Sequence, residues 1–209
     1  MKLKILFFTI LLLFSGCATI FDITPNQSFN FSQGKKVLFS KKQHSEVKLE
    51  LAQDTYTKNT PILFFIEAKS DDFILDISDI TLHQDTKIYT PLSANAILNS
   101  GYNFKISLQN FNIPTPPITS NNYQPSFIFT PYGNIFFISK NYDDSYFKEA
   151  EFSRRIVFAN YLKKTTLNAK EFLGGFIAFI PKDIHDGKIE IRIKIQKEEH
   201  IFSFNLSIN

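Results

Sequence analysis

The chain has one cysteine, Cys17, among 209 residues, and it has no tryptophan. A single cysteine cannot form a disulfide within the chain, which excludes a disulfide-stapled scaffold. Stability must therefore come from packing, and a chain of this length can bury a sizeable core. Phenylalanine is abundant instead, with 24 residues.

Patterns that carry catalysis or metal binding are also missing. No serine lies in a Gly-x-Ser-x-Gly turn, and no Lys-Ser/Thr pair follows Gly174-Gly175 as a phosphate-binding loop requires. None of the histidines has a second His or Cys at metal-ligand spacing. The four histidines are scattered along the chain: His44, His83, His185 and His200. The sequence therefore predicts no catalytic residue, no metal site and no cofactor.

Three isolated polar features have simpler explanations than a site. His185-Asp186 is the nearest approach to a His–carboxylate pair, and we expect it to be a polar turn. The carboxylates within 71–79 lack the spacing of an EF-hand loop, so we expect them in solvated turns. Arg154 lies within the apolar face of a predicted helix, and we expect its stem to lie along the core edge.

An excess of charge of one sign is absent as well. The net charge is +3, and Lys2 and Lys4 lie in the first 16 residues, so the remaining 193 residues carry about +1. A nucleic-acid-binding domain needs a clustered basic face. We therefore predict no nucleic-acid partner.

The first residues have the character of an export signal. Lys2 and Lys4 precede an apolar run over 5–14, and the small residues Ser15 and Gly16 follow it. The run is shorter than the roughly 20 residues that a membrane-spanning helix needs. This arrangement is typical of a signal peptide.

The segment Phe14-Ser15-Gly16-Cys17 resembles the lipobox of bacterial lipoproteins. The resemblance implies cleavage before Cys17 and a diacylglyceryl group on its thiol; two or three acyl chains anchor a protein durably. Ala18 stands where an Asp would favour the inner membrane, which implies the outer membrane. An uncleaved membrane helix and an ordinary signal peptide cut elsewhere remain as alternatives.

Most of the remaining chain has the patterns of short strands. The segment 61–66 is apolar without alternation, which predicts a central strand buried on both faces. The last two runs predict the clearest hairpin. The other predicted strands are 36–40, 46–51, 73–77, 80–83, 102–108, 126–130, 134–139, 172–181, 188–196 and 202–208.

Two helices are predicted among these strands. The first spans about 92–100, where Ser93 can cap the start and Gly101 follows the end. The second is a long amphipathic helix over about 145–163. One stripe of this helix should pack on the sheet, and a smaller stripe lies opposite. The first stripe is Phe147, Ala150, Val157, Phe158 and Tyr161; the second is Phe152, Ile156 and Ala159.

The fold class that follows is mainly β with helical insertions. Residues 1–16 form the predicted signal peptide, 17–34 the lipidated cysteine and its tether, and 35–209 a single β-sandwich-like domain. Part of the tether should pack on the domain as a first strand. The stretch with Thr165-Thr166-Leu167, Glu171, Gly174-Gly175, 176–181, Gly187 and the final hairpin resembles the immunoglobulin-like domains of bacterial surface lipoproteins. The resemblance implies an immunoglobulin-like β-sandwich.

These features predict a membrane-anchored envelope lipoprotein, not an enzyme, that binds a protein partner in the envelope. Candidate contacts are the stripe of Phe152, Ile156 and Ala159, and Tyr123 in a Pro-rich loop over 113–125. The stripe could instead be covered within the domain, and the loop could be a plain connection. An envelope enzyme or small-ligand carrier is the alternative function; the enzyme would show a deep pocket that holds His83 or His185 with carboxylates.

Overall fold

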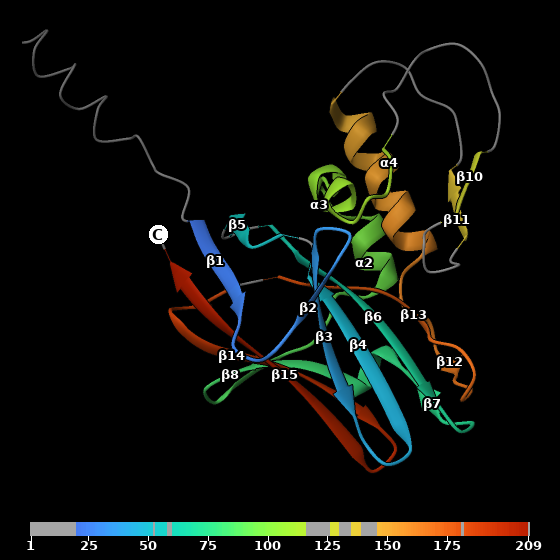
Figure 1. Ribbon diagram of the computed structural model, residues 1–209. Helices are drawn as coiled ribbons and strands as arrows, with labels where there is room; N and C mark the ends of the chain where they lie inside the picture. The colour runs from blue at the N-terminus through green and yellow to red at the C-terminus, as the bar shows by residue number, and fades with distance from the viewer. Residues whose placement is uncertain are drawn as a thin grey trace, which may run out of the picture.

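Antiparallel strands make up most of the molecule, and three short helices gather to one side of them (Figure 1). The computed structural model describes residues 20–51, 53–57, 60–115, 126–129, 135–138, 146–180 and 182–208. The predicted class, mainly β with helical insertions, is confirmed.

The larger sheet has six strands and contains both the first and the last strand of the described chain. Its strands, in spatial order, are β5 (Thr55–Thr57), β1 (Ile20–Pro25), β15 (Glu198–Ile208), β14 (Gly187–Ile195), β8 (Ile80–Gln84) and β9 (Lys87–Tyr89). The predicted final hairpin is β14–β15, and its turn places Gln196 at a φ of +54°. The segment expected to be a tether supplies β1, which pairs with β15 and β5.

The second large sheet has five strands. Their spatial order is β13 (Leu173–Phe179), β6 (Ile62–Ser70), β4 (Ser45–Leu51), β3 (Lys35–Lys41) and β2 (Asn30–Ser32). β6 is an inner strand, and eight of its nine residues are buried, so the prediction of a strand covered on both faces is confirmed. Two small pairs complete the strands of the described residues: β7 (Ile74–Leu75) with β12 (Thr165–Thr166), and β10 (Ser126–Phe129) with β11 (Ile135–Ile138).

The apolar faces of the two large sheets share one core, which we call the sheet core. Strand alternation supplies it: Ile189, Ile191 and Ile193 of β14 are buried in it, as are Phe202 and Phe204 of β15. The residues between them along each strand carry polar side chains. This period of two is what the sequence pattern predicts for a strand with one buried face.

A second core lies on the other face of β6 and β13. There Leu63, Phe65 and Phe176 pack against helices α2 (Ala94–Leu98), α3 (Lys105–Asn110) and α4 (Tyr146–Ala159). We call this second core, together with its three helices, the helix layer. Figure 1 shows these helices together beyond β6 and β13, away from β14 and β15. The predicted first helix is α2, shorter than expected, and Ser93 Oγ accepts a hydrogen bond from Ala96 N at 3.1 Å as its cap.

The predicted strand over 102–108 is wrong. Its second half is helix α3, and Phe104, Leu108 and Phe111 are buried at helical spacings of four and three residues. Ile106, which the alternating pattern placed on the buried face, is instead 68% exposed. Apolar residues at 104 and 108 fit both periods, so the pattern alone favoured the wrong one.

The prediction of one long helix over 145–163 is also wrong, because α4 has 14 residues and ends at Ala159. The chain leaves the helix to pair with β13: Leu162 N donates to Phe176 O at 2.8 Å, and Phe176 N donates to Asn160 O at 2.9 Å. Gly175 makes this approach possible, since a Cβ there would lie 2.8 Å from Asn160 O. A backbone pairing between distant segments therefore sets the end of the helix.

Candidate functional site

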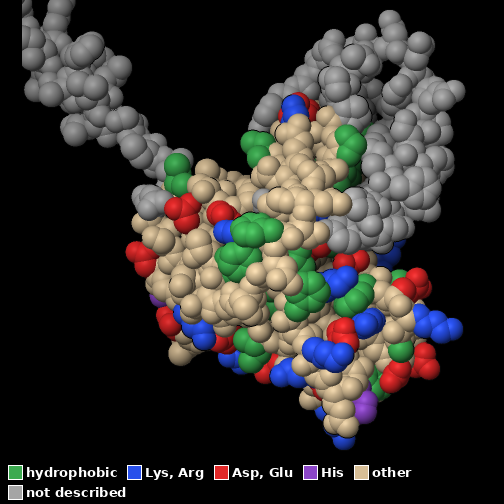
Figure 2. Space-filling view, viewed as in Figure 1, with side chains coloured by type: hydrophobic (Ala, Val, Ile, Leu, Met, Phe, Trp, Pro, Cys, Tyr) green, Lys and Arg blue, Asp and Glu red, His purple; other side chains and the backbone are tan. Residues whose placement is uncertain are grey.

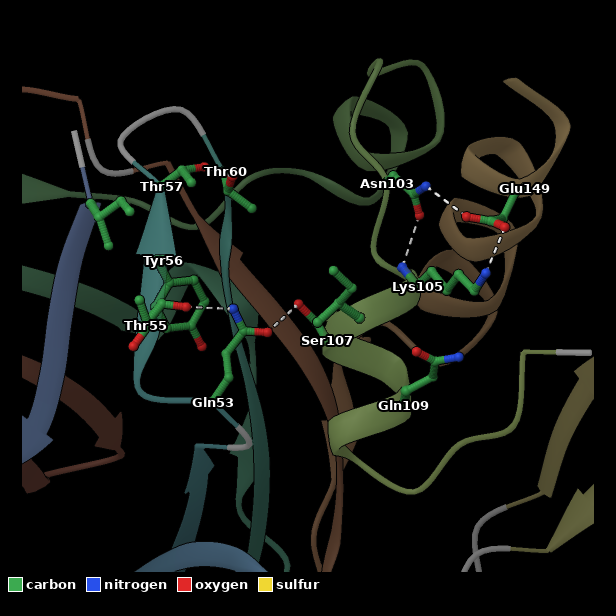
Figure 3. Close-up of a pocket in the computed structure, with 12 residues that line it drawn as sticks. Gln53, Thr55, Tyr56, Thr57, Thr60, Asn103, Lys105, Ser107, Gln109 and Glu149 are labelled. Carbon is green, nitrogen blue, oxygen red and sulfur yellow. Dashed lines mark hydrogen bonds and ion pairs between the residues drawn. The ribbon is translucent and has the colours of Figure 1, made fainter. Parts of the chain in front are cut away.

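The described residues form an open cleft of about 600 Å³ between the edge of the six-stranded sheet and helix α3 (Figure 3). Strand β5 and the residues flanking it supply one wall, and α3 with Glu149 of α4 supplies the other. The lining residues are Ile20, Gln53, Thr55, Tyr56, Thr57, Thr60, Asn103, Lys105, Ile106, Ser107, Gln109 and Glu149.

The strand wall owes its character to the Thr-Tyr-Thr sequence of β5. Successive side chains of a strand point to opposite faces. Thr55 and Thr57 are exposed, whereas Tyr56 is buried and stacks on Phe21 with ring centroids 5.8 Å apart. Burial raises the pKa of Tyr56 well above its ordinary value. The wall therefore presents hydroxyl groups over an aromatic support.

The free edge of β5 is already engaged by neighbouring groups. Thr55 O accepts a hydrogen bond from Gln53 Nε2 at 3.0 Å, and Thr57 O accepts one from Thr60 N at 2.9 Å. The hydroxyls of Thr57 and Thr60 also bond to each other. This edge therefore has few open backbone acceptors for an added strand.

The helix wall carries one ion pair. Lys105 Nζ lies 2.7 Å from Glu149 Oε2, and Asn103 Nδ2 donates to Glu149 Oε1 at 3.1 Å. Hydrogen bonds from Lys105 and Asn103 hold the pKa of Glu149 below its ordinary value. Figure 3 shows the three side chains meeting on the same side of the cleft. Because the two charges neutralise each other, the lining has no net charge.

Gln53 joins the two walls. Its Oε1 accepts from Ser107 Oγ of α3 at 3.0 Å, while its Nε2 bonds the backbone of β5 (Figure 3). One side chain thus bonds to both elements that face each other across the cleft. We expect this bridge to fix the width of the cleft, as a side-chain network locked on both sides does.

The side chains of the cleft suit the binding of a ligand by hydrogen bonds. Its lining contains no histidine or cysteine, and the Ser107 hydroxyl donates to an amide oxygen, which is not a base. Nucleophilic catalysis needs a base within hydrogen-bond reach of the nucleophile. The amide and hydroxyl side chains can instead donate and accept hydrogen bonds with a ligand.

A Ser–His cluster lies elsewhere, at the end of the two large sheets where β3 turns into β4. His200 Nε2 lies 2.8 Å from Ser45 Oγ, and its Nδ1 lies 2.9 Å from Ser40 Oγ. The carboxylate of Glu198 accepts from Ser45 and not from the histidine. His200 is fully buried, and burial lowers its pKa. The cluster joins β15 to β3 and β4, and the burial of Ser45 and His200 favours a structural role.

Charged side chains also form cross-strand pairs on the outer face of the five-stranded sheet. Lys35 Nζ lies 3.2 Å from Glu50 Oε2, and Lys48 Nζ lies 3.8 Å from Glu67 Oε2. Burial, with a contribution from Glu50, raises the pKa of Glu67 to about 7. Figure 2 shows charges of both signs interspersed at the lower right, where β3, β4 and β6 lie in Figure 1. The alternation of sign suits cross-strand pairing.

Two of the predicted partner-surface residues are not at the surface. Phe152 is 6% exposed and Ile156 is 1% exposed, because both pack in the helix layer, and Ala159 is half-buried at the end of α4. The stripe is therefore covered within the domain, and the prediction of a docking surface there is wrong. Cys17 and Tyr123 lie outside the described residues.

The other singled-out side chains lie apart from the cleft. His185 Nε2 lies 3.1 Å from Asp85 on the surface, and His83 Nε2 lies 2.8 Å from Thr81 Oγ1. Arg154 Nη1 donates to Tyr102 O at 3.0 Å, and Asp76 caps a 3-10 turn over Ile77–Asp79. Across the described part of the chain, no three His, Cys, Asp or Glu side chains meet in a group that could hold a metal ion.

The cleft residues were missed because the sequence carries no sign of them. Gln53, Asn103 and Glu149 are far apart along the chain and belong to no motif. Within the described residues, no helix has the length and apolarity to cross a bilayer. No known protein family, characterised protein or solved structure matches this chain.

Proposed function

We propose that this chain is a membrane-anchored lipoprotein of the bacterial cell envelope that acts as a non-enzymatic binding module for another envelope component. The observation that carries the proposal is Phe14-Ser15-Gly16-Cys17 directly after a cationic start and a short apolar run. Ala18 favours the outer membrane. An immunoglobulin-like type of sandwich stays a prediction, supported by two antiparallel sheets that share one core.

The start of β1 supports a role close to the membrane. β1 begins at Ile20, three residues after Cys17, and Ile20 lines the cleft. Three residues of chain span at most about 10 Å. Acyl chains on Cys17 would therefore hold the cleft near the bilayer surface.

The chemistry of the cleft supports binding over catalysis. Its lining holds a neutralised ion pair, amides and hydroxyls, with no nucleophile–base pair. A small-ligand carrier, the alternative function, is favoured by the same cleft, because a volume of about 600 Å³ lies within the roughly 300–1,000 Å³ of small-molecule sites. An envelope enzyme has no such support from the described residues.

Replacement of the cysteine tests the anchor. We expect Cys17→Ser to lose palmitate labelling and to leave the membrane fraction, since a hydroxyl takes no thioether-linked lipid. Ser15→Ala keeps a small residue before the cleavage point and should keep both properties. Retention of Cys17→Ser in the membrane fraction would indicate an uncleaved helix, and mass spectrometry that finds a first residue other than Cys17 would exclude lipobox processing.

Capture of the partner tests the binding role. We expect the lipidated wild-type protein, crosslinked in intact cells, to recover a specific envelope component. Variants with a disturbed cleft, such as Gln53→Ala, should recover less of it. Equal recovery by wild type and Gln53→Ala would place the partner contact elsewhere on the protein.

A further inference from the structure

We propose that the cleft between β5 and α3 binds a neutral saccharide. The inference deepens the proposed function, because it names the chemical class of the envelope component. It starts from charge: among the lining residues there is one cation, Lys105, and one anion, Glu149, and they lie 2.7 Å apart. A charged ligand would find no unpaired charge of opposite sign in the lining, whereas an uncharged ligand needs none.

The hydrogen-bonding groups of the cleft match a ligand rich in hydroxyls. Gln53, Asn103 and Gln109 contribute amides. Gln53 and Asn103 already bond to other lining residues through both oxygen and nitrogen, so Gln109 is the amide that can both donate to and accept from a ligand. Three threonines add hydroxyl oxygens that can accept: Thr55 Oγ1 donates to Asp22 Oδ1 at 2.7 Å, and the hydroxyls of Thr57 and Thr60 bond to each other, so at least two of the three protons are already used. A sugar hydroxyl both donates and accepts, so it can bond to the Gln109 amide in either direction and can donate to the threonine oxygens.

Other ligand classes fit the cleft less well. A phosphate group calls for surplus cations or open backbone amides, and the lysine here is already paired. A metal ion calls for several carboxylates, and the lining has one. A peptide strand calls for an open sheet edge, and the carbonyls of Thr55 and Thr57 are already engaged.

The cleft also has an exposed apolar side chain and a hydrogen-bonded bridge between its walls. Ile106 is 68% exposed and lines the cleft beside the polar groups, where it can lie against the C–H face of a sugar ring. Gln53 bonds to both walls before any ligand arrives. A site held in this way loses less conformational entropy on binding.

The ligand could come from two sources, a glycolipid headgroup in the membrane or a glycan strand of the cell wall. The first test uses the full chain in a detergent without a sugar headgroup, titrated calorimetrically with N,N′-diacetylchitobiose, maltose and inorganic phosphate. We expect saturable binding of at least one disaccharide and none of phosphate. Gln109→Ala should weaken sugar binding tenfold or more, because this exposed amide makes no side-chain hydrogen bond to another described residue.

A matched variant controls for surface changes. Gln43→Ala removes the same side chain from an exposed position in the β3–β4 turn, outside the cleft lining, and should bind sugar like wild type. The proposal is overturned if neither disaccharide binds saturably, if phosphate binds instead, or if Gln43→Ala and Gln109→Ala weaken binding equally.

Vesicles distinguish the two sources. The Cys17→Ser protein, which lacks the proposed anchor, is sedimented with phosphatidylcholine vesicles that contain or lack a neutral galactolipid. Binding that depends on the galactolipid and is lost in Gln109→Ala supports a headgroup; binding of soluble disaccharide alone supports a glycan strand. Failure of lipidation at Cys17 would leave sugar binding unchanged, so the two proposals can fail separately.

Discussion

The sheet core and the helix layer share β6 and β13 but follow different rules of construction. In the sheet core, β8, β14 and β15 have five, nine and eleven residues, and apolar side chains at alternate positions of each strand are buried there. In the helix layer, α2 and α3 have five and six residues, fewer than two turns each. A helix that short displays one or two apolar residues per face, so its packing depends on neighbours distant in sequence.

The largest expected effect comes from a glycine in β13, one of the strands that both regions share. Gly174 lies in β13, and a Cβ there would lie 1.7 Å from Ile66 O of β6. We expect Gly174→Ala to cost more than about 4 kcal/mol in free energy of unfolding, or to prevent folding, because backbone atoms cannot move aside. Denaturant unfolding measures the loss.

Gly101→Ala is the matched control, since nothing lies within 4 Å of a Cβ at that position. It should change the free energy of unfolding by no more than about 0.5 kcal/mol. Equal stability of the two variants would show that β13 and β6 do not approach as closely as described.

Replacement of one phenylalanine in each core tests whether the two cores unfold independently. Phe64 packs on Phe179 and Phe204 in the sheet core, and Phe104 is buried in the helix layer. Each change to alanine should cost about 3–5 kcal/mol by lost burial and an unfilled cavity. Hydrogen exchange should show loss of protection throughout for Phe64→Ala, but mainly in α2–α4 for Phe104→Ala. Uniform loss in both variants would mean that the molecule has one cooperative core.

These two regions also mark what the sequence could predict. The final hairpin, β3, β4, β8 and the doubly buried β6 followed from alternation or its absence, and the local cap at Ser93 followed from residue type. Helix α3 was not predicted, because the exposed Ile106 completes an alternating pattern that is typical of a strand. The end of α4 was not predicted, because it depends on the close approach of Gly175 to Asn160, which lies 15 residues away in the sequence. The cleft joins residues from three such places, so no local pattern predicts it.

The carboxylate of Glu67 should make the stability of the protein depend on pH, because it is buried on the outer face of the five-stranded sheet. The folded-state pKa of Glu67, about 7, lies above the ordinary value of 4.5, so stability should fall as pH rises from about 4.5 to 7. We expect Glu67→Gln to flatten this dependence and to raise the free energy of unfolding at pH 8 by about 1–3 kcal/mol. Unfolding curves between pH 4 and pH 8 measure both effects.

Glu46→Gln is the control on the neighbouring strand. Lys41 and Lys69 lower the pKa of Glu46, so its ionised form is the favoured one. This variant should gain no stability at pH 8. A gain by Glu46→Gln equal to that of Glu67→Gln would assign the effect to net charge and not to burial.

Two buried tyrosines give the smallest expected changes in stability, and they differ in their hydrogen bonds. Tyr161 of the helix layer donates to Leu92 O at 2.6 Å and accepts from Ala178 N at 3.0 Å, whereas the Tyr56 hydroxyl of the sheet core has no hydrogen-bond partner among the described residues. Tyr161→Phe should cost about 1–2 kcal/mol, because it leaves two buried groups unpaired. Tyr56→Phe should be neutral or stabilising. Thermal unfolding of both variants decides the matter, and a matching loss in Tyr56→Phe would contradict the assigned contacts.

The pairing of β1 with β15 has a consequence for folding during the proposed export. Phe21 lies opposite Ile208, so the opening residues of the sheet find their neighbour almost two hundred positions later. Contacts between residues so far apart in sequence slow folding, because the entropy of closing the loop is lost before any stabilising contact forms. If the chain crosses the membrane N-terminus first, as the proposed export implies, β1 would stay unpaired with β15 and accessible to a chaperone until residues 198–208 had also crossed.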